Sequence, residues 1–284
     1  MSGDLPQKGK LMEFTYAVTP LSADTWRIDE AMGGAHTYAY LLEGAERALL
    51  IDTCQGLGNL RAAVEQLTKK PVLVANTHGH LDHIGGNAAF AAAYLTEADL
   101  PVAQEHGDPA YRRGMFLRFA QELGVLLGEE QLAALAHRCE GARYLPMAQG
   151  DVFELGGRTL RVLATPGHTP GSVCFLEEGR GALYTGDTAC ARGVLLSLPH
   201  SCGVATFRQS IRSLRALADR FTTIHPGHHE APLGPEVLEK YDACATGILE
   251  GRVQGIPGES AGEACLLGRW EDISIAYRAD HIFD

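Results

Sequence analysis

Residues 76–83 read NTHGHLDH, and no other short segment says as much about the fold of this chain. Three histidines and one aspartate fall within six residues, directly after the apolar run at residues 72–75, which predicts a buried strand. If the chain stays extended, His78 and His80 point to the same side, and Gly79 between them permits a sharp turn. Imidazole and carboxylate groups suit Zn²⁺, and also Fe or Mn. The segment therefore predicts a metal site where a strand ends.

Three later segments also end an expected strand and begin a loop. They read TPGHTPGS at residues 165–172, TGDT at residues 185–188 and HPGHHE at residues 225–230. In an α/β fold, loops at one end of the sheet converge, and ligands usually bind there. We therefore expect His168, Asp187 and His228 to join the side chains of residues 78–83. Five histidines and two carboxylates suffice for two metal ions that share a bridging carboxylate.

Apolar runs and helical patterns alternate along the rest of the chain. Strands are expected at residues 38–42, 48–51, 72–75, 159–164, 172–176, 182–184, 221–224 and 273–277. Helices are expected at residues 57–67, 85–94 and 105–138, and from about residues 206 and 235 onward. This order predicts an α/β protein whose two similar halves flank a helical insert at about residues 104–146. We expect a single domain, 1–284. Its C-terminal extension, about residues 251–284, would add an edge strand, cover the pocket or contact a second copy.

The composition narrows the class of protein. The 284 residues are 45% hydrophobic, which excludes a long disordered chain, and the net charge of −11 disfavours nucleic acid as a partner. No apolar run reaches the roughly 18 residues of a membrane span, and the first residues lack the apolar core of a secretory signal. The seven cysteines are scattered without a C-x-x-C pair, as in reduced proteins. We expect a cytoplasmic protein that acts on a small molecule. The sequence leaves the choice between a monomer and a homodimer open.

Taken together, the motifs resemble those of the metallo-β-lactamase superfamily of metallohydrolases. The matching segments are His-x-His-x-Asp-His at 78–83, Gly-His-Thr at 167–169, Gly-Asp-Thr at 186–188 and Pro-Gly-His at 226–228. The resemblance covers about residues 35–90 and 150–232 and implies an αββα sandwich. It implies a first metal held by His78, His80 and His168, and a second metal held by Asp82, His83 and His228. Asp187 would bridge the two metals.

The resemblance also implies a chemistry. Two divalent metal ions, Zn²⁺ first and Fe or Mn as alternatives, would hold a hydroxide that attacks an electrophilic centre, so Asp82 and Asp187 would be catalytic as ligands. Asp52 would orient a ligand histidine, or else accept hydrogen bonds from nearby backbone N–H groups. His229 would either support the centre from outside or replace His228 as the ligand, and the Pro226-Gly227 turn favours His228.

Single residues separate the branches of the superfamily. Asp187 and the missing signal argue against antibiotic hydrolysis, and His80 argues against the di-iron oxygen-reducing members, which carry Glu there. Quorum-signal lactonases carry Tyr where this chain has Cys190. The thioester hydrolases of the glyoxalase II type are most similar, although their glutathione-binding pattern is not recognisable here. We expect a hydrolase of a small ester, thioester, lactone or amide. The alternatives are a mononuclear-iron persulfide dioxygenase and a non-catalytic metal-binding module.

The substrate pocket is expected between the helical insert and the loop at residues 190–203. Candidate pocket residues are His200, Cys190, Tyr111 and Phe116. His200 would contact substrate or donate a proton to a leaving group. Four further histidines carry no signal for a role, namely His36, His106, His137 and His281.

Overall fold

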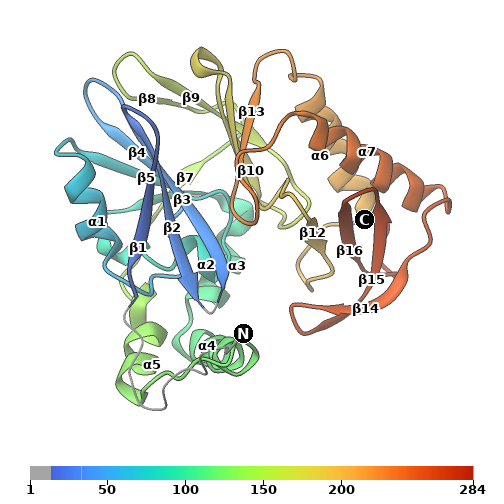
Figure 1. Ribbon diagram of the computed structural model, residues 1–284, viewed down its shortest axis with the longest axis horizontal. Coiled ribbons are helices and arrows are strands. Elements are labelled where there is room, and N and C mark those ends of the chain that lie inside the picture. Colours follow the sequence, from blue (N-terminus) through green and yellow to red (C-terminus); the bar gives the residue numbers. More distant parts are fainter. Residues whose placement is uncertain (1–13, 33, 284) are drawn as a thin grey trace, which may run out of the picture.

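Two stacked β-sheets form the centre of the structure, a computed structural model that describes residues 14–32 and 34–283 (Figure 1). The first sheet has the strand order β1-β2-β3-β4-β5-β6-β7. Its strands are β1 (Tyr16–Ser22), β2 (Thr25–Met32), β3 (Ala35–Glu43), β4 (Ala48–Ile51), β5 (Val72–Ala75), β6 (Ala93–Thr96) and β7 (Tyr144–Met147). Neighbours from β1 to β4 are antiparallel, and those from β4 to β7 are parallel. The carboxyl ends of β4 to β7 therefore lie along one edge.

The second sheet has the strand order β13-β11-β10-β9-β8. Its strands are β8 (Val152–Glu154), β9 (Thr159–Ala164), β10 (Val173–Glu177), β11 (Ala182–Gly186) and β13 (Thr223–Pro226). β10 is antiparallel to both β9 and β11, and β13 is parallel to β11. As a result β9, β11 and β13 all end at the same edge.

Alternate residues of the strands pack the two sheets together. Tyr40 and Leu42 of β3 face the second sheet and share one buried cluster with Phe175 of β10 and Tyr184 of β11. The rings of Tyr40 and Tyr184 meet edge to face, with their centroids 5.2 Å apart. Burial of these large side chains provides the apolar driving force that holds the sheets together.

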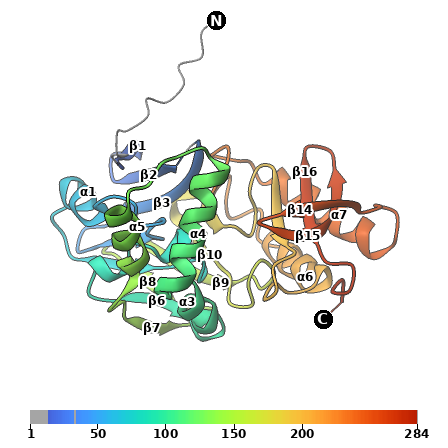
Figure 2. The same cartoon turned by 90° about the horizontal axis from the view of Figure 1, so that it is seen from below.

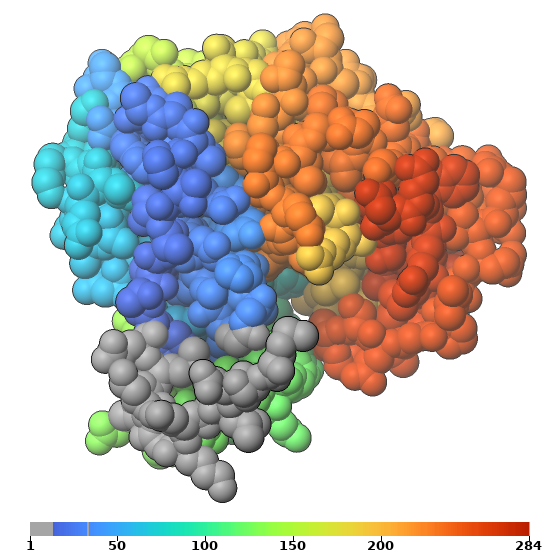
Figure 3. Space-filling model, in the orientation of Figure 1, coloured from blue at the N-terminus to red at the C-terminus, as the bar shows by residue number. Residues whose placement is uncertain are grey.

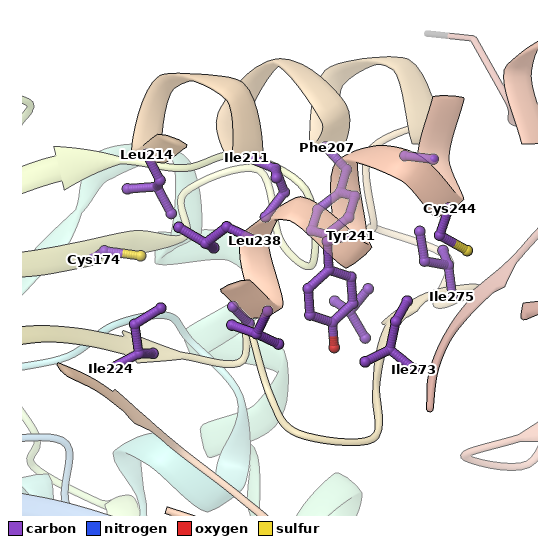
Figure 4. Packing of buried hydrophobic residues seen from close by; sticks show 14 of the residues in the cluster. Cys174, Phe207, Ile211, Leu214, Ile224, Leu238, Tyr241, Cys244, Ile273 and Ile275 are labelled. Carbon is purple, nitrogen blue, oxygen red and sulfur yellow. The ribbon is translucent and has the colours of Figure 1, made fainter. Parts of the chain in front are cut away.

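Helices cover the outer faces of both sheets. α1 (Leu60–Leu67) packs on the first sheet, and α6 (Val204–Arg215) and α7 (Glu236–Leu249) pack on the second. Figure 4 shows the latter cluster, in which Phe207 of α6 and Tyr241 of α7 lie side by side with ring centroids 5.8 Å apart. The order helix, sheet, sheet, helix confirms the αββα sandwich expected from the sequence.

The helical insert lies between β6 and β7. It contains α3 (Leu100–Gly107), α4 (Pro109–Glu122) and α5 (Glu129–Ala136). In Figures 1 and 2 these green helices stand beside the edge at which the parallel strands end. Phe116 of α4 packs against Leu132 and Leu135 of α5, and this small cluster holds the insert together.

The C-terminal residues form a third sheet. Its order is β12-β16-β15-β14, with β12 (Gly193–Leu196), β14 (Ile256–Ser260), β15 (Glu263–Trp270) and β16 (Ile273–Tyr277). β12 is parallel to β16 and lies earlier in the chain, between β11 and α6. The third sheet therefore anchors the C-terminal residues beside the sandwich, on the side opposite the insert (Figure 2).

The helices of the described part are short. α4 and α7 have 14 residues each, whereas a helix needs about 20 to cross a bilayer. Among residues 14–32 and 34–283, no helix has both the length and the apolar character of a membrane span.

The expected helix at residues 85–94 is wrong. α2 (Leu81–Ile84) ends just before this segment, which contains a single 3₁₀ turn at Asn87–Ala89 and ends in strand β6. β6 pairs with β5 on one side and β7 on the other, so sheet burial outweighs the helical preference of its alanines. The sequence also missed β1, because most of its side chains are exposed and show no apolar alternation.

Gly85 permits the close approach of two chain segments just after the histidine-rich turn. A Cβ atom at this position would lie 2.1 Å from the carbonyl carbon of Gln55, which is backbone and cannot swing away. The N–H of Gly85 donates to the carbonyl of Cys54 at 2.8 Å. The turn is therefore fixed against the loop that follows β4.

We expect Gly85→Ala to lower the free energy of unfolding by about 3 kcal/mol, because backbone segments would be forced apart. Gly114→Ala is the matched control: it lies inside α4, and a Cβ there meets nothing within 4 Å. The control should raise stability by up to about 1 kcal/mol, since alanine favours the helix. Urea unfolding of both variants measures the difference, and equal midpoints would contradict the close approach.

Candidate metal centre

Four loops at one edge of the sandwich carry all the residues expected as metal ligands. The loops follow β5, β9, β11 and β13, the strands whose carboxyl ends meet at this edge. The N–H of Val173 donates to the carbonyl of Thr77 at 2.8 Å, and that of Gly227 to the carbonyl of Gly186 at 2.8 Å. Backbone hydrogen bonds thus link the loops to each other across the two sheets.

Three histidines converge on one point. Nδ1 of His80 lies 3.0 Å from Nε2 of His78 and 2.9 Å from Nε2 of His168. The rings stand nearly perpendicular to one another, and all three side chains are buried. Three imidazole nitrogens aimed at a common point are a typical arrangement for holding a metal ion.

A second trio lies beside the first. Nε2 of His228 lies 3.2 Å from Oδ2 of Asp82 and 3.3 Å from Nε2 of His83. Asp187 stands between the two trios: its Oδ1 is 3.3 Å from Nε2 of His83, and its Oδ2 is 3.5 Å from Nε2 of His168. The two oxygens of one carboxylate therefore face the two trios, which is what a bridging ligand must do.

Hydrogen bonds outside the trios fix the tautomers of the histidines. Nδ1 of His168 lies 2.7 Å from the carbonyl oxygen of Leu195, and Nδ1 of His228 lies 2.7 Å from that of His36. A carbonyl oxygen only accepts, so these Nδ1 atoms carry the hydrogen. In the neutral rings Nε2 then keeps a bare lone pair directed into the centre, which suits metal binding.

Asp52 fixes two more histidines. Its Oδ2 lies 2.8 Å from Nδ1 of His83 and also accepts from the hydroxyl of Thr77 at 2.8 Å. Because that hydroxyl hydrogen is used, Oγ1 of Thr77 accepts from Nδ1–H of His78 at 3.0 Å. Oδ1 of Asp52 accepts from the backbone N–H of Thr77 at 2.7 Å. Asp52 therefore makes both kinds of contact that the sequence left as alternatives.

Asp99, at the start of the insert, joins two ligand loops. Its Oδ2 accepts from the N–H of Gly79 at 2.7 Å and from the hydroxyl of Thr169 at 2.8 Å, and its Oδ1 accepts from the N–H of Gly171 at 2.7 Å. Burial raises the pKa of Asp99, while the three donors favour its charged form. The carboxyl thus holds the turn at residues 78–83 against the loop of His168.

The two trios differ in charge. Burial, followed by neighbouring imidazoles, lowers the pKa of His78 and His80 well below the usual histidine value. Burial acts in the same direction on His228, but Asp187 and Asp82 outweigh it and raise that pKa to about 9. Burial raises the pKa of Asp82, yet the nearby imidazoles lower it to about 2. The carboxylates therefore gather on one side, and they favour a positive charge there.

The donor set fits divalent metal ions. Oδ1 of Asp187 is buried and has no hydrogen-bond partner within the part of the chain that the structure describes. Around it lie the inward-facing Nε2 atoms of His83 and His228, together with a second carboxylate from Asp82. Lone pairs and carboxylate oxygens packed about 3 Å apart repel one another unless a cation lies between them. We conclude that this centre is built to hold metal.

The centre opens into a cavity with a volume of about 780 Å³. Its walls come from the insert on one side and from β12 and the third sheet on the other, and Figure 3 shows the recess between these two parts of the surface. Tyr111, Cys190 and His200 line it, as the sequence suggested. Ser260, Glu263 and Leu267 line it as well, so the C-terminal extension both forms a sheet and covers the pocket.

Two expected site residues lie elsewhere. Phe116 is fully buried in the core of the insert, because it lies on the face of α4 that packs on α5. His229 lines the cavity wall, with its ring centroid 6.2 Å from that of His228 and its carbonyl accepting from Tyr38. Among the described residues, no hydrogen bond joins the His229 ring to a ligand, so it does not orient one.

Sequence reasoning missed several contributors to the site, among them His106, Asp99 and the backbone carbonyls of Leu195 and His36. His106 stacks on His80 with ring centroids 4.6 Å apart, although it carried no motif. Asp99 lies outside every recognised segment, and the carbonyl of His36 is a backbone group whose role no side-chain pattern can reveal. The role of His106 becomes visible only in the folded structure, where its ring clusters with those of His80 and His200.

Comparison with known proteins places the chain in a family. A family model described as "Metallo-beta-lactamase superfamily" matches residues 32–233. The acyl-coenzyme A thioesterase MBLAC2 of Homo sapiens is 29% identical over 212 residues, which cover 69% of this chain and 74% of that protein. The hydroxyacylglutathione hydrolase of Anaeromyxobacter dehalogenans is 32% identical over 206 residues, which cover 72% of this chain and 65% of that protein.

Solved structures agree on the fold. A metallo-beta-lactamase from Pontibacter korlensis superposes with a TM-score of 0.58 at 17% identity and covers 82% of this chain and 99% of its own. A metallo-beta-lactamase family protein from Thermus thermophilus also gives 0.58, at 24% identity, with 84% and 81% covered. The family match spans more than half of the chain and contains all seven residues of the two trios and their bridge. The chain therefore belongs to the metallo-β-lactamase superfamily.

Proposed function

We propose that the protein is a dinuclear metal-dependent hydrolase that cleaves acyl thioesters. One observation carries this proposal: two ligand trios with Asp187 between them open directly into a cavity. The family match supports hydrolysis, and curated relatives are named as an acyl-coenzyme A thioesterase, a hydroxyacylglutathione hydrolase and a thioesterase. The cavity volume of about 780 Å³ lies within the range typical of small-molecule sites.

Each residue of the centre has a task in this reaction. His78, His80 and His168 would hold one metal ion, and Asp82, His83 and His228 would hold the other, with Asp187 shared. Bound there, two divalent ions would supply a water of lowered pKa and polarise the carbonyl oxygen of the substrate. Zn²⁺ suits this nitrogen and carboxylate set, and Fe and Mn are alternatives. The outward hydrogen bonds of the histidines keep their ligand atoms aimed inward throughout.

The cavity walls favour an acyl group with apolar character. Leu81, Met115, Phe119 and Leu195 line the cavity. Burial of an alkyl chain against such side chains contributes about 0.8 kcal/mol for each methylene group. A thioester also suits a site without a dedicated acid, because a thiol has a pKa of about 8.5 and leaves readily as the thiolate.

We expect the purified protein to carry about two transition-metal ions per chain and to lose thioesterase activity on chelation. Adding back Zn²⁺, Fe²⁺ or Mn²⁺ separately should restore turnover in at least one metal form, because the ligands lie in place within the fold. Elemental analysis and a thiol-release assay measure both quantities. One iron per chain together with oxygen consumption on a persulfide would instead establish a dioxygenase. Turnover by metal-free protein would refute the mechanism.

We expect Asp187→Asn to lower the metal content below two per chain and to reduce kcat/KM at least about 100-fold. The amide keeps the size of the side chain but removes the negative charge that faces both trios, and even weaker perturbations around metal ligands cost about 10- to 100-fold. Asp219→Asn is the matched control, since Asp219 is an exposed aspartate beyond the end of α6. Normal metal content and activity in Asp187→Asn would rule out the bridging role.

A further inference from the structure

A second group of aromatic side chains lies on the cavity side of His80. The ring of His106 stacks on that of His80 at 4.6 Å, with 21° between the planes. The ring of Tyr111, on α4, lies next to that of His106, with the centroids 4.5 Å apart and 34° between the planes. His80, His106 and Tyr111 all line the cavity. The insert therefore brings a phenol close to the metal centre by way of one intervening imidazole.

The hydrogen atoms in this group can be assigned from what each partner is able to donate. The backbone N–H of Leu81 points at Nδ1 of His106, at 3.1 Å, and a backbone N–H only donates. Nδ1 of His106 is therefore the bare nitrogen, and the hydrogen of the ring is on Nε2. Nε2 lies 3.0 Å from the hydroxyl oxygen of Tyr111, so His106 donates and the tyrosine oxygen accepts.

The hydroxyl hydrogen of Tyr111 must then point away from His106. Within residues 14–32 and 34–283, His106 is the hydrogen-bond partner of this hydroxyl, and no second group accepts its hydrogen. Burial, followed by Glu105, raises the pKa of Tyr111 to about 12, which keeps the hydroxyl protonated at neutral pH. The open volume beside it is the cavity. Tyr111 is thus a hydrogen-bond donor directed toward the space where substrate would lie.

The same assignment excludes a third metal site. Ligand atoms of His80, His106 and His200 lie within 4.8 Å of one another, which by itself would fit a metal ion. However, both nitrogens of His106 are already used, one as acceptor and one as donor. Nδ1 of His80 is directed at His78 and His168, so the hydrogen of the His80 ring is on Nε2. This Nε2–H donates to Nε2 of His200 at 2.6 Å. His200 supports the orientation of His80, and no three bare lone pairs remain.

We propose that Tyr111 is a catalytic residue whose hydroxyl donates a hydrogen bond to the carbonyl oxygen of the acyl substrate, with His106 as its positioning residue. This inference rests on the proposed thioester hydrolysis. Leu81, which orients His106, lies between the expected ligands His80 and Asp82. The hydroxyl of Tyr111 is therefore held at a fixed position relative to the metal centre. A donor that is fixed before the reaction needs no reorganisation when negative charge develops on the carbonyl oxygen.

The reaction that this donor assists is balanced as follows. The oxygen of one water bonds to the acyl carbon, and the electron pair of the C=O π bond moves onto the carbonyl oxygen, where Tyr111 donates. The pair then returns, the C–S bond breaks, and its electrons leave with sulfur. Of the two protons of the water, one ends on sulfur and one in solvent, and the acyl group leaves as the carboxylate. Tyr111 keeps its own proton throughout.

The test compares Tyr111→Phe with wild type in the metal-loaded protein. The variant retains the ring stack and removes one hydroxyl, so we expect unchanged metal content and melting temperature but a fall in kcat/KM of about 100-fold. Tyr94→Phe, at a partly buried tyrosine of the core between the sheets, is the matched control and should retain activity. A loss below about twofold, or a loss of metal, would overturn the catalytic role.

Two further readouts locate the donor. If it acts at the carbonyl oxygen, aryl and alkyl thioesters should lose the same factor, whereas a loss confined to the alkyl thioester would place the donor at sulfur and overturn the proposal. His106→Gln can keep one acceptor and one donor, so it should retain more activity than His106→Leu. Equal activity of these two variants would contradict the positioning role.

A binding measurement separates this inference from the proposed function. Hexanoate resembles the carboxylate product, and calorimetry should show about tenfold weaker binding to Tyr111→Phe, because a hydrogen bond to a charged oxygen is lost. Wild type that binds hexanoate through Tyr111 without cleaving thioesters would refute the function and keep the donor. Wild type that cleaves thioesters while Tyr111→Phe is unaffected in both assays would refute the donor alone.

Discussion

The metal centre depends on which ring nitrogen carries the hydrogen in four of its histidines. In each case that hydrogen is donated outward to an oxygen, and the bare Nε2 faces the centre. The acceptors are Thr77 for His78, Asp52 for His83, the carbonyl of Leu195 for His168 and the carbonyl of His36 for His228. Reversing any one of these tautomers would place a hydrogen on the nitrogen that faces the centre and would block it as a metal ligand. The ligand set is therefore defined by the surrounding backbone as much as by the ligands.

These acceptors explain why distant parts of the fold belong to one site. Leu195 lies on β12, which is held by β16 in the third sheet, and His36 lies on β3 in the first sheet. Asp99, at the entrance to the insert, binds the N–H groups of two ligand loops. The insert and the C-terminal strands thus act on the geometry of the metal centre as well as on the shape of the cavity.

The sequence could predict which seven side chains cluster, because they lie in short segments that follow apolar strands. The order of the segments predicted an α/β protein, and their resemblance to the superfamily implied the αββα sandwich. What the sequence missed depends on pairing between distant segments: β6 becomes a strand because β5 and β7 flank it, and β1 is too exposed to show alternation. Phe116 and Tyr111 are both aromatic residues of α4, and only the packing of α5 decides which one reaches the cavity.

The cavity has two kinds of wall, and they have different origins. The metal side comes from residues within 32–233, the part that matches the family. The wall formed by the third sheet includes Ser260, Leu267 and Ala276, which lie beyond that match, whereas Tyr111 of the insert lies within it. Since the metal centre supplies chemistry common to many substrates, discrimination between substrates must come from groups that touch the rest of the molecule. In this chain the groups that line the cavity away from the metal centre lie on the insert, on β12 and on the C-terminal strands.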